Sequence, residues 1–189
     1  MNNKVFSSLA KLIRVPLRFI KYFLISILNH FSQSKIIPID NSLKVIVVST
    51  GGVATTTLIK YLKLYTKVNN ENDNDGYKHL IKFPFLQNRN TQIIYIYGNY
   101  EKIFKSLKRR KIFLKQMVKL GCPLCFFLSG KIEKFFFKKC IKRQINNFKG
   151  KNSVLALKFD NIWKEKYKIK NFLKIDSHKF IKNFPAKNN

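Results

Sequence analysis

Residues 43–65 read LKVIVVSTGGVATTTLIKYLKLY, and this stretch decides the fold. Its first part, residues 43–48, is an almost unbroken aliphatic run, which is typical of a strand covered on both faces of a parallel sheet. After a short turn, apolar side chains return at helical spacing, at Leu58, Ile59, Leu62 and Tyr65. The stretch therefore predicts a strand, a tight turn and a helix, the opening unit of an α/β domain.

The turn carries groups that bind phosphate or sulfate. Gly51 and Gly52 allow several backbone N–H groups to face one concavity, and the helix that follows adds the positive end of its dipole. Three hydroxyls come from Thr55, Thr56 and Thr57. The simpler alternative is a glycine turn before an ordinary helix with a threonine cap. A Walker A loop is excluded, because its Gly-Lys-Ser/Thr ending is missing.

The same turn resembles the 5′-phosphosulfate-binding loop of the sulfotransferases, in which a basic residue, Ser, Gly and two threonines precede an apolar helix. The threonine pair corresponds to Thr55-Thr56 or to Thr56-Thr57. Gly52 or Val53 then occupies the basic position, which is a departure from the family pattern. The resemblance implies that the donor 3′-phosphoadenosine 5′-phosphosulfate is held by Gly51, Gly52, Thr55, Thr56 and Thr57.

A second segment, QIIYIYGNYEKIFKSLKRR at residues 92–110, resembles the 3′-phosphate signature of the same family. In that signature a strand ends in Arg, and the following helix carries a Ser eight residues later. Ser106 matches the Ser, whereas Gly98 stands where the Arg is expected. The resemblance implies that Ser106 binds the 3′-phosphate, and Lys102 or Arg109 can supply the missing positive charge.

Between these segments, Tyr77-Lys78-His79 resembles the Lys-x-His segment that carries the family's catalytic base, although the lysine here directly precedes the histidine. The resemblance implies that His79 takes the proton of the acceptor hydroxyl. The alternative is a structural histidine beside an apolar strand. Residues 154–163 and 172–175 resemble a late strand and helix of the same fold, so the likeness spans residues 44–175 with gaps.

The charge balance calls for an anionic partner. The 189 residues include 38 Lys and Arg against 9 Asp and Glu, which gives a net charge of +29. Such an excess repels itself unless an anion takes part. We expect a nucleotide donor and an anionic membrane surface, with nucleic acid as the alternative. Residues 68–76 are rich in Asn and include three acidic residues, so we expect a mobile, solvated loop. Their spacing is not that of a calcium-binding loop, so we expect no metal.

The N-terminal residues 3–31 predict an amphipathic helix. One side carries Lys4, Lys11, Arg14, Arg18 and Lys21, and the other is aliphatic and aromatic. We expect residues 1–34 to lie on an anionic membrane as the peripheral anchor of a cytoplasmic protein. The alternatives are a helix packed on the domain and a signal anchor. The uncharged run 22–28 is shorter than the ~20 residues that span a bilayer.

Two further segments, 102–119 and 131–149, predict basic helices. Cys122 and Cys125 form a Cys-x-x-Cys pair, and the third cysteine is Cys140. We expect these to be buried, reduced thiols, and the alternatives are a redox pair or half of a zinc site.

These observations predict an α/β fold, a parallel sheet with strands near 43–48, 93–97 and 154–158 and with flanking helices, plus the N-terminal amphipathic helix. The resemblance implies a P-loop sulfotransferase-like domain over residues 43–180. The expected activity is transfer of a sulfuryl group to an unknown hydroxyl acceptor. The alternative is a non-catalytic basic protein of the same fold that binds membrane or nucleic acid.

Overall fold

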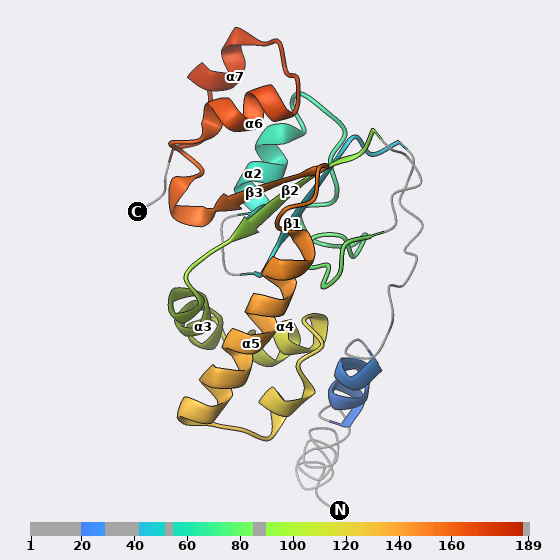
Figure 1. Ribbon diagram of the computed structural model, residues 1–189, viewed down its shortest axis with the longest axis vertical. Helices are drawn as coiled ribbons and strands as arrows, with labels where there is room; N and C mark the ends of the chain where they lie inside the picture. The colour runs from blue at the N-terminus through green and yellow to red at the C-terminus, as the bar shows by residue number, and fades with distance from the viewer. Residues whose placement is uncertain (1–19, 29–41, 52–54, 85–89, 187–189) are drawn as a thin grey trace, which may run out of the picture.

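The computed structural model describes residues 20–28, 42–51, 55–84 and 90–186. Its centre is a parallel sheet of three strands, β1 (Val45–Ser49), β2 (Gln92–Tyr97) and β3 (Val154–Lys158), in the spatial order β1-β2-β3 (Figure 1). Val45 lies opposite Gln92, and Ile93 lies opposite Val154. The predicted α/β class and the three predicted strands are confirmed.

Helices connect and follow the strands. Helix α2 (Thr55–Leu62) lies between β1 and β2 in the chain. Three helices separate β2 from β3: α3 (Tyr100–Arg109), α4 (Phe113–Lys119) and α5 (Gly130–Phe148), with a 3-10 turn at Pro123–Phe126. A second 3-10 turn, Phe159–Asn161, leads to α6 (Lys166–Phe172) and α7 (His178–Lys182). Figure 1 shows α3, α4 and α5 gathered below the sheet and α6 and α7 above it.

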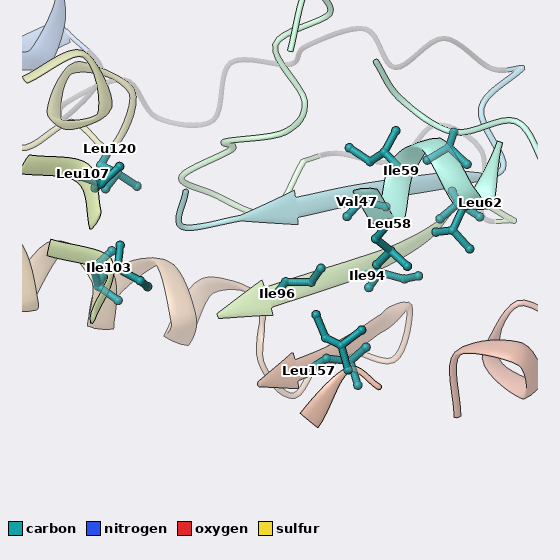
Figure 2. Close-up of a cluster of buried hydrophobic side chains, with 14 of the residues drawn as sticks. Val47, Leu58, Ile59, Leu62, Ile94, Ile96, Ile103, Leu107, Leu120 and Leu157 are labelled. Carbon is teal, nitrogen blue, oxygen red and sulfur yellow. The ribbon is translucent and has the colours of Figure 1, made fainter. Parts of the chain in front are cut away.

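Both faces of β1 and of the middle of β2 are buried, which explains why these strands read as continuous apolar runs, whereas β3 is mostly half-buried. One face packs against α2 through Val47, Ile94, Ile96, Leu58 and Leu62 (Figure 2). The other face packs against residues 77–80 and the end of α5, through Ile46, Val48, Ile93, Tyr95, Tyr77, Leu80 and Phe148. The sheet is thereby a rigid platform whose strand ends can hold a site.

The segment after α2 covers the free edge of β1. The Asn69 side chain accepts a hydrogen bond from the Val47 N–H (2.7 Å) and donates one to the Val47 carbonyl (3.2 Å). Further along, the Ser49 N–H donates to the carbonyl of Lys78 (2.8 Å). These contacts satisfy backbone groups that an edge strand otherwise leaves unpaired. The prediction of a solvated loop at 68–76 is therefore wrong at Asn69, which is only 1% exposed.

The predicted basic helix over 102–119 is two helices in the structure. Lys111 adopts a left-handed conformation (φ 55°), and the Ile112 N–H donates to the Leu107 carbonyl (3.1 Å), which ends α3 and redirects the chain into α4. This turn lets Leu107 and Phe113 both pack into the core that includes Phe137 of α5. The second predicted helix, over 131–149, corresponds to α5 and is confirmed.

The cysteines lie together beside this helical group. Cys122 and Cys125 are buried, unbridged thiols with 3.0 Å between their Sγ atoms, and Cys140 is a half-buried free thiol. The hydrogen bond to Cys125 and burial raise the pKa of Cys122 to about 12, so this sulfur stays protonated. This agrees with the expectation of buried, reduced thiols.

Residues 20–28 form a helix that packs on the domain. The Ser26 hydroxyl is buried and donates to the Met117 carbonyl of α4 (3.4 Å), and the Phe23 ring meets the Phe127 ring edge-on at 4.7 Å. Packing on the domain was one of the alternatives for this segment. The predicted anchor otherwise falls on residues 1–19 and 29–34, outside the described residues. In the described part of the chain, no helix is long and apolar enough to cross a membrane.

Candidate functional site

A pocket of about 370 Å³ lies where β1 ends and α2 begins. Its volume falls in the range of small-molecule sites, roughly 300–1,000 Å³. The residues around it come from the turn after β1, the start of α2, the loop before β2, the end of α3 and α4. They are Gly51, Thr55, Thr56, Lys78, His79, Ser106, Leu107, Arg109, Arg110, Ile112 and Gln116. Six residues proposed from the sequence thus line one pocket: Gly51, Thr55, Thr56, His79, Ser106 and Arg109.

Glycine is required at position 51 for two reasons, the backbone conformation and the closeness of the Gln116 side chain. Its φ is +83°, and a Cβ added there would lie 2.8 Å from the side chain of Gln116. Gln116 is itself buried and donates from Nε2 to the Thr50 carbonyl (3.3 Å), so α4 closes on the turn. Gly52, the second predicted glycine, lies outside the described residues. Gly51 therefore presents bare backbone at the pocket, where a side chain would collide with Gln116.

Lys78, like Arg110 and Gln116, lines the pocket although the sequence analysis did not propose it for the site. It is only 8% exposed, and its Nζ donates to the Thr56 hydroxyl and to the Glu71 carbonyl, both at 2.7 Å. Burial lowers the pKa of Lys78, while the charge of Asp73 opposes that shift. The only signal in the sequence was its place beside His79. The ammonium group thus reaches the first turn of α2, next to a loop that has no basic residue of its own.

His79 also lines the pocket, next to the end of β1. Its Nδ1 is 3.1 Å from the Ser49 carbonyl, the last residue of β1. Because a carbonyl only accepts, Nδ1 carries the proton, and Nε2 is left as the acceptor nitrogen. Burial lowers the pKa of His79 to about 4, although the Ser49 hydrogen bond and Asp73 act in the opposite direction. The imidazole is therefore neutral at physiological pH.

Helix α3 brings its C-terminal half to the pocket. Asn99 caps the helix by accepting from the N–H groups of Glu101 (2.9 Å) and Lys102 (3.2 Å), which fixes its start. Ser106 and Arg109 follow on the pocket side, and Arg110 lies beside them. Its Nε donates to the Ser106 carbonyl (3.3 Å).

Two predicted donor-binding residues do not line this pocket. Lys102 is exposed and lies seven residues before Arg109, which corresponds to about 10 Å along the helix axis. Thr57 is two residues beyond Thr55 on α2, so its side chain faces another direction. It lines a small apolar hollow with residues that include Leu58, Phe159 and Trp163. Lys102 and Thr57 therefore lie outside this pocket, while Arg109, the other residue expected to supply the positive charge, lines it.

The charged side chains that line the pocket are all positive. Its lining includes Lys78, Arg109 and Arg110 with three hydroxyl groups, and the described lining residues include no carboxylate. Such a set donates hydrogen bonds and positive charge, which suits phosphate or sulfate groups. Among the residues that the structure describes, no group of three or more His, Cys, Asp or Glu side chains is arranged to hold a metal ion.

Comparisons with known proteins give no family assignment. No protein-family model, no curated protein and no solved structure matches the chain. Functional inference therefore depends on the pocket and on the sequence motifs that line it.

Proposed function

We propose that this chain is a sulfotransferase-like enzyme that takes a sulfuryl group from 3′-phosphoadenosine 5′-phosphosulfate and transfers it to a hydroxyl acceptor. One observation carries the proposal. Two segments that resemble the family's donor-binding motifs, and the histidine between them, line a single pocket of about 370 Å³. The adjacent parallel strands β1 and β2 bring the segments after their C-terminal ends to one edge of the sheet, where ligands bind in open α/β folds.

Two of the departures from the family pattern, at the loop after β1 and at Gly98, have nearby compensation. The loop after β1 lacks its basic residue, and the Lys78 ammonium group stands 2.7 Å from the Thr56 hydroxyl. Gly98 replaces the expected arginine, and Arg109 and Arg110 line the pocket beside Ser106. In this proposal the Gly51 backbone, Thr55, Thr56 and Lys78 hold the 5′-phosphosulfate. Ser106 and the two arginines hold the 3′-phosphate.

The neutral His79 has a defined part in the transfer. The acceptor oxygen forms a bond to sulfur while the bond from sulfur to the bridging phosphate oxygen breaks. The acceptor's proton passes to His79 Nε2, and 3′-phosphoadenosine 5′-phosphate leaves with the bridging electron pair. Lys78 and the Thr56 hydroxyl stabilise the charge that develops on that oxygen.

A second candidate is a protein of the same fold that binds an anionic partner, membrane or nucleic acid, without turnover. The observation that favours it is the pKa of His79, which at about 4 makes the imidazole a weak proton acceptor. Binding and turnover therefore have to be measured separately.

The test of binding is titration calorimetry with 3′-phosphoadenosine 5′-phosphate, compared with ATP. We expect Lys78→Met and Thr56→Val each to weaken binding of this nucleotide about tenfold or more, because a hydrogen bond to a charged oxygen contributes about 1.5–3 kcal/mol. Lys60→Met is the matched control, since it removes the same charge from an exposed position of α2 outside the pocket. Equal affinity for both nucleotides, or no effect of the pocket variants, contradicts the proposal.

Turnover is tested on the same protein with a panel of hydroxyl acceptors. His79→Gln should lower the rate about 10²–10⁴-fold and leave nucleotide affinity within a few-fold of wild type. Nucleotide binding with no turnover for any acceptor supports the second candidate instead.

A further inference from the structure

An apolar row runs along the outer side of the helix at residues 20–28. Ile20, Leu24 and Leu28 follow one another at intervals of four residues and are 51%, 53% and 67% exposed. Ser26 lies on the opposite side of this helix and donates to the Met117 carbonyl, while Phe23 lies at the flank of the row and contacts the Phe127 ring. The row is therefore oriented outward by the packing of the helix on the domain.

A second exposed apolar group adjoins this helix. Phe127, Ile132 and Phe135, before and within the first turns of α5, are 61%, 57% and 52% exposed. The contact between the Phe23 and Phe127 rings joins the two groups. Figure 1 shows residues 20–28 and the start of α5 at the same end of the molecule, opposite α6 and α7. We call these six residues, Ile20, Leu24, Leu28, Phe127, Ile132 and Phe135, the apolar end.

Lysines accompany the apolar end. Lys21 and Lys131 are exposed neighbours of Ile20 and Ile132, and the Lys139 Nζ lies 4.6 Å from the centre of the Phe135 ring. The described carboxylates nearby are already engaged, because Glu133 pairs with Lys108 (2.5 Å) and Glu101 pairs with Lys134 (2.7 Å). Exposed aliphatic and aromatic side chains with flanking lysines are the composition of surfaces that insert into a bilayer interface.

We infer that the apolar end docks on a bilayer that contains anionic lipid. Charge complementarity selects this occupant. A second copy of the chain, also at +29, is repelled. Nucleic acid stacks on aromatic rings and gains little from Ile20, Leu24, Leu28 and Ile132. A bilayer can contact both the apolar side chains and the lysines, because the apolar groups insert among its acyl chains and its anionic headgroups attract the lysines. This inference is independent of the anion pocket.

The experiment is flotation of the full chain with vesicles of phosphatidylcholine, with and without phosphatidylserine. We expect binding to the anionic vesicles only. The Leu24→Ser, Phe135→Ser double variant should reduce the bound fraction about tenfold. Its matched control is Leu64→Ser with Tyr167→Ser, which changes a leucine and an aromatic residue that are also exposed, at 73% and 59%.

Charge is tested in the same assay. Lys131→Glu with Lys139→Glu should reduce binding more than Lys179→Glu with Lys182→Glu, which makes the same charge change on α7. The inference is overturned by equal binding to both vesicle types, or by equal effects of the end variants and their controls. It is also overturned if the apolar variant splits a dimer in sedimentation equilibrium, or abolishes binding to single-stranded RNA while vesicle binding persists.

Discussion

The Lys78 ammonium reaches Thr56 because its own backbone is fixed at both ends of the residue. The Lys78 N–H donates to Asp73 Oδ1 (2.9 Å), and its carbonyl accepts from the Ser49 N–H (2.8 Å). The side chain then extends from a fixed point to the Thr56 hydroxyl. A lysine held in this way loses little conformational freedom on binding an anion, which favours affinity.

Gly51→Ala should be markedly destabilising. The alanine would have to adopt φ +83°, at a cost of about 1–2 kcal/mol, and its Cβ would collide with Gln116. Overpacking of this kind typically adds about 1–3 kcal/mol. Urea unfolding should show a loss near the sum of the two.

Gly150→Ala is the matched control for Gly51→Ala, because Gly150 has the same φ of +83° and open space around a Cβ. It should show the backbone cost alone. Adding Gln116→Ala to Gly51→Ala should remove most of the collision. If the two glycine variants lose equal stability, the close approach of Gln116 to the turn is contradicted.

His79 should make the protein less stable in mild acid. Its pKa is about 4 in the folded protein and ~6.5 when unfolded, so below pH 6.5 the unfolded state binds the proton preferentially. Stability from this group is complete above pH 6.5 and is lost as the pH falls towards 4. From pH 7 to pH 5 the free energy of unfolding should drop by about 2 kcal/mol.

The measurement is urea unfolding at both pH values. His79→Gln should remove most of this difference between pH 7 and pH 5. His178→Gln serves as the control and should keep it, because His178 is exposed on α7. If His79→Gln loses as much stability between pH 7 and pH 5 as the wild type does, other groups cause the acid sensitivity.

At the scale of elements, the sheet was predictable and the path of the connecting segments was not. Continuous apolar runs predicted strands at 43–48, 93–97 and 154–158, within two residues of β1, β2 and β3, and for β1 and β2 burial on both faces admits little else. The break between α3 and α4 has no glycine or proline to announce it. It occurs at Lys111, where packing against α5 imposes a left-handed residue.

In the site, too, some residues could be predicted from the sequence and others could not. Thr56, His79, Ser106 and Arg109 stand in motifs that can be read locally. The roles of Lys78 and Gln116 depend on contacts across 22 and 66 residues of chain, to Thr56 and Thr50. Sequence periodicity carries no information about such long-range pairs. For that reason the approach of Lys78 to the first turn of α2 was found only in the structure.

The loop that carries Lys78 and His79 should depend on Asp73. This carboxylate has a 7% exposed side chain, pairs with Lys119 of α4 and accepts from the Lys78 N–H. Removing one partner of a buried pair costs about 3–5 kcal/mol, and the partial exposure of Lys119 reduces this to about 2 kcal/mol. Asp73→Ala should therefore destabilise the protein and also weaken binding of 3′-phosphoadenosine 5′-phosphate.

Glu71→Gln is the comparison for Asp73→Ala. It breaks the ion pair of Glu71 with Lys63 at the surface and leaves the Glu71 carbonyl, which accepts from Lys78, unchanged. Its effect on urea unfolding and on nucleotide affinity should be clearly smaller. Equal losses in the two variants would mean that Asp73 does not fix the loop.

The whole molecule has to fold against its own charge. With 38 basic and 9 acidic residues, most cations have no acidic partner available, so repulsion extends over the entire surface. Anions at the pocket and at the apolar end would relieve it in two separate places. This gives the two proposed ligands a common physical benefit without any direct contact between the two sites.

Sodium chloride should accordingly stabilise the protein. Raising the salt from about 0.05 M to about 0.5 M shortens the Debye length from roughly 14 Å to roughly 4 Å, which screens the repulsion. Each kcal/mol gained raises Tm by about 2–4 °C in a chain of this size. We expect an increase of several degrees in a thermal scan, and a smaller increase after Lys105→Glu, Lys115→Glu and Lys142→Glu reduce the net charge.

Pyrophosphate in the same scan separates the pocket from general screening. At matched ionic strength it should raise Tm beyond the chloride value, because the proposed anion site at Lys78, Thr56 and Arg109 would also bind it. Lys78→Met should remove this extra increase and keep the chloride effect, since one charge among many changes the overall repulsion little. A chloride series with no rise in Tm would show that the charge excess does not limit stability. An extra increase that Lys78→Met leaves unchanged would place the bound anion elsewhere on the surface.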